Sequence, residues 1–287
     1  MEAVKIGIIG GSGIYDIEGF SDVKTIAVET PFGEPSDRVI IGTLSGVRFA
    51  FLPRHGRGHT VSPTELNFRA NIYALKVLGV EQVISVSAVG SLKEELKPRD
   101  FVIPDQLFDR TKDRPSTFFS DGIVAHVGFA DPFCPHLSKL AYNTAQEVGI
   151  SVHKGGTYVC IEGPQFSTRA ESNVYRRLGF SIIGMTNIPE AKLAREAEMC
   201  YVTVALVTDY DVWKEDEEVS VETVIANLNA NTENAKKFIK TILPKIKNIE
   251  RCCKCDKALA NAIITAGEFI PKKTLDKLKP LIEKYIT

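Results

Sequence analysis

The sequence predicts an α/β protein in which one domain is built on a sheet of buried strands. Residues 202–207 form an apolar, β-branched run, which is typical of a strand buried on both faces of a sheet and is too short for an ordinary helix. This run ends in two carboxylates, Asp209 and Asp211, and ligands of open α/β sheets bind just outside the carboxyl ends of the strands. Other strand-like runs alternate with helical patterns along the chain, which favours the same fold class.

The amino-acid composition and net charge argue against some classes of binding partner. Apolar residues make up 44% of the 287 residues, enough for a sizeable core, and the 25% of charged residues argue against disorder. The net charge of −1 gives no reason to expect nucleic acid or an anionic membrane as a partner. The chain starts with a strand-like run rather than a signal peptide, and no apolar stretch reaches membrane-spanning length. We therefore expect a cytoplasmic protein that binds neither nucleic acid nor a membrane.

The first predicted strand, residues 4–9, leads into a glycine-rich turn that contains Ser12. Such a turn exposes backbone N–H groups and can bind phosphate. It is not a dinucleotide fingerprint, because Asp16 stands where the third glycine should be, and it lacks the lysine of a P-loop. A tight turn without a ligand would explain the glycines but not Ser12.

A basic cluster follows another predicted strand. Residues 39–41 and 47–52 are strand-like, and the second run leads directly into residues 53–59, which carry two Arg and two His among glycines. Arg offers a planar fork to an oxyanion, and Gly lets the backbone approach it. The cluster predicts an anion site, with a solvated basic loop as the alternative.

Apolar periodicity and capping residues predict the remaining elements. Helices are expected over residues 64–78 and 137–148, from residue 167 or 168 with Glu171 placed for a capping box, over residues 189–198, from residue 220 onward, and in the tail. Strands are expected over residues 83–86, 101–103, 156–161 and 180–183.

Residues 105–135 form a long polar section without periodicity, which indicates a functional or interface loop. It contains His126 among apolar neighbours. By composition alone, a single His in such a setting is more often structural than functional.

The six cysteines include a cluster, Cys252, Cys253 and Cys255, and three dispersed residues, Cys134, Cys160 and Cys200. Zinc is disfavoured here, because no second Cys or His cluster has the spacing of a tetrahedral site. Disulfides remain open, since they do occur inside cells of hyperthermophiles, and the low glutamine content fits a thermophilic source. The expected organisation is a main domain over residues 1–248 and a cysteine-containing helical extension over residues 249–287 packed on it.

Five motifs occur in the order found in the trimeric purine nucleoside phosphorylase superfamily, and the sequence resembles most closely its branch that cleaves S-methyl-5′-thioadenosine. They are Ile8-Ile9-Gly10-Gly11-Ser12-Gly13, Arg54-His55-Gly56, Glu162-Gly163-Pro164-Gln165-Phe166, Gly184-Met185-Thr186 and Thr208-Asp209-Tyr210-Asp211. The resemblance covers about residues 4–246 and implies a mixed sheet curling toward a barrel, flanked by helices. It also implies a homotrimer or a dimer of trimers, and reversible phosphorolysis of methylthioadenosine to adenine and 5-methylthioribose-1-phosphate.

The resemblance implies a site with a phosphate end and a nucleoside end, and neither a metal nor a cofactor, because phosphate is a substrate. The matched phosphate-binding residues are Ser12, Arg54, His55, Ala88 and Thr186, with backbone N–H groups near Gly11 and Ala88. The matched substrate-binding residues are Phe166, Ser167, Met185, Asp209, Asp211 and His126, of which His126 reaches a neighbouring subunit's pocket. Asp209 is the expected catalytic residue, facing purine N7.

The residues at positions 167 and 209 indicate which purine base the site prefers. Relatives that cleave inosine and guanosine typically have Glu and Asn where this sequence has Ser167 and Asp209. An ionised acid repels the acceptor of a 6-oxopurine but accepts from a 6-amino group, so the resemblance favours adenine. Three alternatives remain: a broader purine nucleoside phosphorylase that accepts adenosine or inosine, a catalytically silent nucleoside-binding regulator, and an NAD-dependent dehydrogenase.

Overall fold

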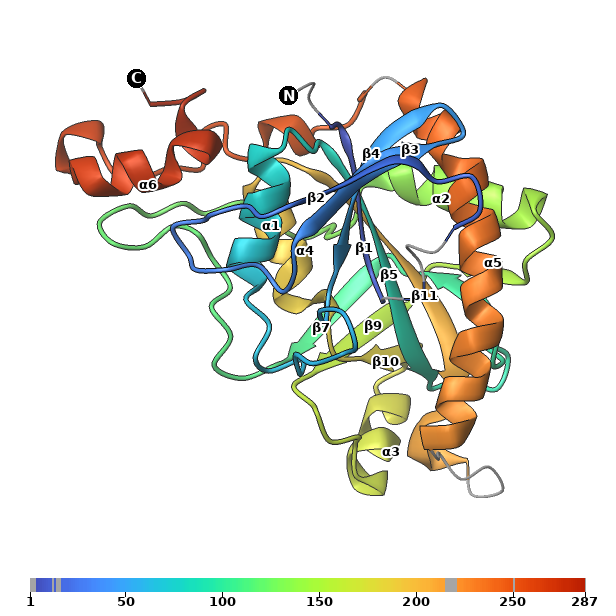
Figure 1. Cartoon of the computed structure of the whole chain (residues 1–287). Helices are drawn as coiled ribbons and strands as arrows, with labels where there is room; N and C mark the ends of the chain where they lie inside the picture. The colour runs from blue at the N-terminus through green and yellow to red at the C-terminus, as the bar shows by residue number, and fades with distance from the viewer. Residues whose placement is uncertain (1–3, 12, 14–16, 215–220, 250, 287) are drawn as a thin grey trace.

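A mixed sheet of eleven strands forms the centre of the molecule (Figure 1). The computed structural model describes residues 4–11, 13, 17–214, 221–249 and 251–286. The strands are β1 (Ile6–Gly10), β2 (Ser21–Ile26), β3 (Val39–Leu44), β4 (Val47–Pro53), β5 (Gln82–Ser91), β6 (Phe101–Ile103), β7 (Gln106–Arg110), β8 (Val152–Lys154), β9 (Thr157–Ile161), β10 (Ile182–Gly184) and β11 (Cys200–Asp209).

Strand β5 is the hub of this sheet. The order is β2-β3-β4-β1-β5-β10-β9-β7, and β11 pairs with β5 and β6 while β8 pairs with β6. β5 runs parallel to β1 and to β11 but antiparallel to β10, so the sheet is mixed. The predicted α/β class with a mixed sheet is confirmed.

Helices cover the sheet on two sides. α1 (Phe68–Val77) and α4 (Asn187–Glu196) pack together on one side, and α2 (Pro135–Glu147) and α5 (Val221–Lys247) lie on the other (Figure 1). α3 (Arg169–Arg177) lies beyond the ends of β9 and β10, and α6 (Lys272–Ile282) contacts α1. Among the described residues, none of the helices combines the length and the apolar character needed to span a membrane.

Local sequence rules account for several boundaries. Thr168 caps α3, and its hydroxyl accepts from the Glu171 backbone N–H while the Glu171 carboxylate accepts from the Thr168 backbone, as the capping box predicts. α1 begins later than expected, because the side chain of Asn67 caps it by accepting from the backbone N–H of Ala70.

The loop expected over residues 105–135 was partly wrong. It contains β7, a mostly exposed and polar edge strand that pairs in parallel only with β9, so neither an apolar run nor alternation marks it in the sequence. β2 and β8 were also missed, since neither strand contains a buried residue and so neither gives an apolar run. β5 was predicted too short, because a strand was expected only over residues 83–86 and the small residues that follow, up to Ser91, are still strand.

Candidate active site

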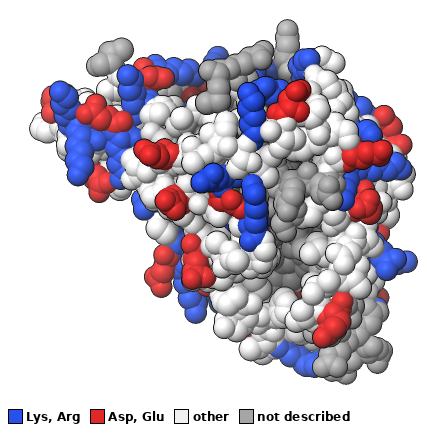
Figure 2. Space-filling model, in the orientation of Figure 1, with Lys and Arg blue, Asp and Glu red and all other residues white. Residues whose placement is uncertain are grey.

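Several strand ends meet at one edge of the sheet. β4, β1, β5 and β11 are mutually parallel where they pair, so their carboxyl ends emerge together. The backbone N–H of Arg54, just beyond β4, donates to the carbonyl of Gly10 at the end of β1, 2.9 Å away. Figure 2 shows this face of the molecule hollowed near its centre. The candidate site is therefore where the fold class places one.

The two acids at the end of β11 are brought together by a turn. Asp209 ends the strand, and Asp211 takes a positive φ of 53° and starts a short 3-10 helix. Its backbone N–H donates to Asp209 Oδ1 at 2.8 Å. The strand has ended between these two residues, so the turn, and not the strand's period of two, places their side chains.

Gly90 of β5 lies against this pair of acids. A Cβ at residue 90 would stand 2.9 Å from Asp209 Oδ1 and 3.0 Å from Ile183 Cγ2, so any side chain would push the carboxylate aside. The turn after β11 therefore needs a glycine in the neighbouring strand.

Burial raises the pKa of both acids. For Asp209, burial outweighs hydrogen bonds from the Thr208 hydroxyl and the Asp211 N–H, which act in the opposite direction. For Asp211, burial is again the largest cause, and the Asp209 charge adds to it. Burial therefore favours retention of a proton on either acid, and for Asp211 the charge of Asp209 acts in the same direction.

Thr208 suits a carboxyl group that changes protonation. Its hydroxyl oxygen lies 2.7 Å from Asp209 Oδ2 and 3.2 Å from the carbonyl oxygen of Val89. An ionised Asp209 accepts the single hydroxyl hydrogen. A protonated Asp209 can donate to Thr208, which then donates to Val89. Both states of the acid are accommodated without an unpaired group.

Three buried side-chain oxygens near this end make no hydrogen bond within 3.5 Å among the described residues. They are Asp211 Oδ2, the hydroxyl oxygen of Ser167 in the turn before α3, and the hydroxyl oxygen of Ser172 in α3. The Ser172 hydroxyl nonetheless lies close enough to Asp211 to oppose the rise in the pKa of that acid. α3 contacts the 3-10 helix that begins at Asp211, so the two turns are neighbours. Because buried polar atoms are nearly always paired, the Ser167 hydroxyl is a candidate ligand-binding atom, whereas Asp211 has the Ser172 hydroxyl beside it. Phe166 beside Ser167 is 51% exposed, an apolar ring free to cover a ligand.

Arg114 fixes the turns that carry Glu162 and Met185. Its guanidinium donates to the Met185 carbonyl at 2.8 Å and to the Glu162 carbonyl at 2.5 Å, and pairs with the Glu162 carboxylate at 3.1 Å. Gly163 has a φ of 70°, and a Cβ there would overlap Met185 Sδ. The turn after β9 thus packs against the turn after β10.

At the other end, Arg54 lies in a buried ion pair. Its Nε and Nη2 meet the two carboxylate oxygens of Glu190 at 2.9 and 3.1 Å, and Arg54 and Glu190 are 2% and 0% exposed. Nη1 donates to the Val86 carbonyl at 2.9 Å, and Nη2 also donates to the Ser85 hydroxyl at 2.6 Å. Of the guanidinium's N–H groups, one on Nη1 remains without an acceptor among the described residues.

His55 is neutral and held in one tautomer. Its Nδ1 lies 2.9 Å from the Val61 carbonyl, which can only accept, so Nδ1 carries the proton. Burial, and then the neighbouring Arg54 charge, lower the pKa of His55 to about 4. The free Nε2 is therefore an acceptor, and it suits a protonated phosphate oxygen better than an ionised one.

This gives a pH prediction. A histidine with a lowered folded-state pKa stabilises the fold above its unfolded pKa of 6.5 and loses that contribution as the pH falls toward about 4. The thermal unfolding midpoint should fall over this window, and His55→Gln should flatten the fall. The measurement is thermal unfolding from pH 4 to 7.5. An equal slope in the variant would assign the dependence to other groups.

Arg54, Glu190, Ser85 and the Val86 carbonyl form what we call the Arg54 cluster. Thr186 and Ala88 lie next to it. The Thr186 hydroxyl is 3.1 Å from that of Ser87, which links the start of α4 to β5. Ala88 is the one residue of β5 classed as exposed, although its neighbours in the strand are buried. The backbone of β5 is therefore accessible at this residue.

Two other predicted residues are placed differently. Ser12 lies outside the described residues. His126 is exposed, and its backbone N–H donates to the Ala262 carbonyl at 2.9 Å, beside the C-terminal segment. The described contacts of His126 thus do not connect it to the Asp209 end within one chain.

Sequence reasoning missed Glu190 and Arg114. An acid in the first turn of a helix normally indicates stabilisation of the helix dipole, so Glu190 carried no mark of a buried partner. Arg114 lies in a section without periodicity, and only the fold brings it to the turns at Glu162 and Met185.

Residues 5–244 match the profile of the phosphorylase superfamily. The chain is 59% identical over 282 residues to the S-methyl-5′-thioadenosine phosphorylase of Koribacter versatilis (strain Ellin345), covering 98% of this chain and 96% of that protein. A crystal structure of methylthioadenosine phosphorylase from an antarctic soil metagenomic library has a TM-score of 0.95 and 50% identity, covering 98% of this chain and 100% of that one. The structure of a variant of the adenosine/methylthioadenosine phosphorylase from Schistosoma mansoni in complex with adenine has a TM-score of 0.86 and 36% identity. The match covers 92% of this chain and 100% of that one.

Proposed function

Since this chain belongs to the phosphorylase superfamily, we propose that it catalyses the reversible phosphorolysis of S-methyl-5′-thioadenosine. The products are adenine and 5-methylthioribose-1-phosphate. The observation that carries the proposal is the pair of buried acids, Asp209 and Asp211, at the same sheet edge as the Arg54 cluster. An acid end binds an aminopurine, and an arginine end binds phosphate.

The two acids can overcome the main chemical obstacle to the reaction, which is the departure of the base. The bond between sugar and base breaks through a state with cationic character on the sugar, and adenine leaves poorly as an anion. A protonated Asp209 can donate to purine N7 as negative charge develops there, which is general acid catalysis. Asp211 and the Ser167 hydroxyl can bond the polar edge of the base.

At the other end, phosphate is both nucleophile and counter-ion. The open Nη1 N–H of Arg54, the Thr186 hydroxyl and backbone N–H groups near Ala88 can hold its oxygens, with Ser12 assigned from its motif. Bound phosphate then stabilises the cationic sugar. We propose that the reaction uses neither a metal nor another cofactor, because these groups neutralise the phosphate themselves.

Three substrates test the proposal. On purified protein with phosphate, we expect kcat/KM for methylthioadenosine to exceed that for inosine by at least about 100-fold, because the acids reject a 6-oxo acceptor. Comparable values for adenosine would instead indicate the broader specificity that the name of the Schistosoma mansoni relative suggests. A protein that binds methylthioadenosine but releases no adenine would be a silent regulator.

We also propose that residues 249–287 belong to the same structural unit as residues 1–248. Leu259, Leu278 and Leu281 are buried in the core cluster that α1 and α4 form. The Tyr73 hydroxyl of α1 donates to the Lys277 carbonyl at 3.1 Å. An extension that contributes core side chains is integral to the domain rather than appended to it.

The position of His126 supports a shared site in a trimer. His126 is exposed on a loop that the C-terminal segment braces, and Phe129 of the same loop packs against the core, so the imidazole can enter a neighbouring subunit's pocket. We expect His126→Ala to raise the KM for nucleoside about 10- to 100-fold, the range for a lost pocket contact, and to leave phosphate affinity and assembly unchanged.

Subunit mixing tests that sharing directly. Trimers made of His126→Ala and Asp209→Asn chains contain pockets that combine an intact Asp209 with an intact His126. Coexpressed and purified by two tags, such trimers should be more active than either parent. Verified mixed trimers without added activity would return His126 to a structural role.

A further inference from the structure

Four cysteines from distant parts of the sequence meet in one cluster. The Sγ atoms of Cys134, Cys200, Cys253 and Cys255 all lie within 4.8 Å of one another. Three of these residues are buried and Cys253 is half-buried. The sequence shows only the pair at residues 253 and 255, so the missing half of a tetrahedral site is supplied by the fold.

The geometry points to a metal site, and we propose that these four side chains bind one zinc ion as thiolates. Zinc in structural sites takes four sulfur ligands at about 2.3 Å in a tetrahedron, which places sulfurs about 3.8 Å apart. The Sγ atoms of Cys200 and Cys253 are 3.3 Å apart, and no two Sγ atoms of the cluster are more than 4.8 Å apart. Shifts of under about 1 Å would complete the tetrahedron.

The surroundings favour negative charge on the sulfurs. Binding Zn²⁺ releases one proton from each thiol and leaves a site with a net charge of about −2. Cys134 is the N-cap residue of α2, where the helix dipole and free N–H groups stabilise a thiolate. Arg251 lines the same pocket as Cys134, Cys200 and Cys253, and it supplies a positive charge beside them.

The cluster joins three segments of the chain. Cys134 ends the loop that carries His126, Cys200 begins β11, and the other two cysteines begin the C-terminal segment. The backbone N–H of Cys134 also donates to the Tyr201 carbonyl at 2.8 Å. Asp209 is at the opposite end of β11, so the zinc would be structural, holding the C-terminal segment against the loop that it braces.

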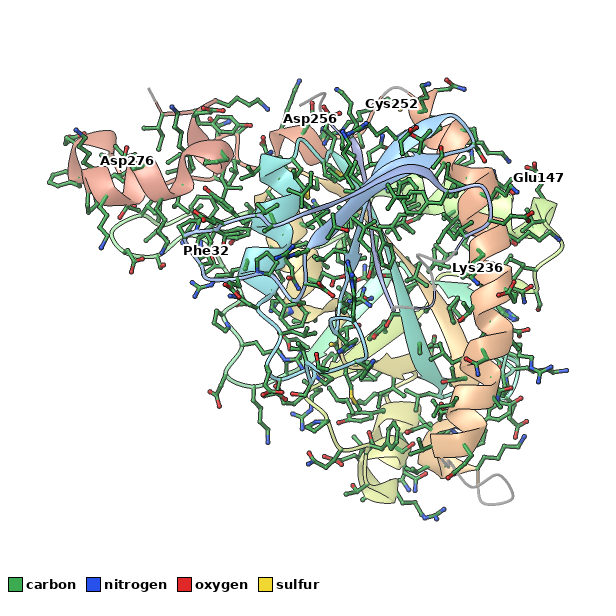
Figure 3. All side chains as sticks on the ribbon, viewed as in Figure 1. Phe32, Glu147, Lys236, Cys252, Asp256 and Asp276 are labelled. Atoms are coloured by element: carbon green, nitrogen blue, oxygen red, sulfur yellow. The ribbon has the colours of Figure 1, made fainter. Side chains whose placement is uncertain are left out.

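The chain provides matched controls. Cys252 is exposed, outside the cluster, and 3.2 Å from His136 Nδ1, and it lies beside the end of α5 (Figure 3). Cys160 is buried elsewhere, with its sulfur 3.4 Å from the Ile188 backbone N–H. Cys252→Ser and Cys160→Ser therefore change a thiol without changing the cluster.

Metal analysis tests the proposal. The full chain, purified under reducing conditions and equilibrated with zinc chloride before desalting, should hold about one zinc per chain by mass spectrometry of the metals. Cys252→Ser and Cys160→Ser should keep it, while Cys253→Ser and Cys255→Ser should lower zinc affinity at least about 100-fold. Zinc should raise the thermal unfolding midpoint of the wild type but not of Cys253→Ser.

The wild type alone decides the matter if the serine variants do not fold. Cobalt(II) added to reduced, metal-free protein should give thiolate charge-transfer bands and the visible bands of a tetrahedral ion. Reduced protein that binds neither zinc nor cobalt at micromolar concentrations overturns the proposal. So does a metal-free protein in which peptide mapping shows cysteines of the cluster joined as disulfides after purification without reductant.

Discussion

Asp209→Asn should lower kcat for methylthioadenosine by about 10²–10⁴-fold, the range for loss of a general acid or base. Asparagine keeps the shape of the side chain and can donate an N–H, but it cannot transfer a proton to N7. The same change removes the acid that repels a 6-oxopurine, so inosine should improve relative to methylthioadenosine. Steady-state kinetics on both nucleosides measure the two effects, and unchanged adenine-nucleoside activity would defeat the assignment.

The pH profile gives this prediction a second readout. Burial raises the pKa of Asp209, and the reaction needs its protonated form, so kcat/KM should fall as the pH rises through that pKa. Asp209→Asn should lack this fall. Thr208→Val removes the hydroxyl that stabilises the ionised acid, so the fall should move to higher pH. A profile shared by all three proteins would show that another group titrates.

Patterns between neighbouring residues in the sequence predicted several of the strands and helix ends that carry the site. The apolar run at residues 202–207 became the middle of β11, and Ser167 and Thr168 came directly before α3 with its capping box. Both predictions depend on nearest neighbours along the chain, namely burial of a short strand and pairing of backbone groups at a helix end. The strand-end rule then placed Asp209 and Arg54 at one edge of the sheet.

Contacts between distant segments could not be predicted this way. Nothing near Glu190 in the sequence indicates that it neutralises Arg54, since the two are brought together only when α4 packs against β5 and β11. The same holds for Cys134 and Cys200, which looked like isolated buried thiols until the fold placed them beside Cys253 and Cys255. A buried charged or polar group without a partner costs free energy, so once the fold is known such a group points to its partner. The sequence alone does not show which groups are buried together.

The second large expected effect is that of removing Arg54, which is paired with Glu190 and therefore affects both stability and phosphate binding. Arg54→Ala alone leaves a carboxylate that is 0% exposed without its partner, which costs about 3–5 kcal/mol when a buried ion pair is broken. That variant should therefore unfold at a lower temperature as well as bind phosphate weakly. Its KM for phosphate cannot by itself separate a phosphate contact from damage to the fold.

A neutral pair separates the two roles. In Arg54→Gln/Glu190→Gln the facing amides can hydrogen-bond, and Ser85 and Tyr201 can still donate to the amide oxygen that replaces the carboxylate at residue 190. The double variant should recover most of the thermal stability that Arg54→Gln loses. It should still show a KM for phosphate raised about 10- to 100-fold, the size of a lost charge-assisted bond, with a much smaller change for nucleoside. If the stable double variant binds phosphate normally, Arg54 serves the fold alone, and the anion must be held by the turn at Ser12, Thr186 and the backbone near Ala88.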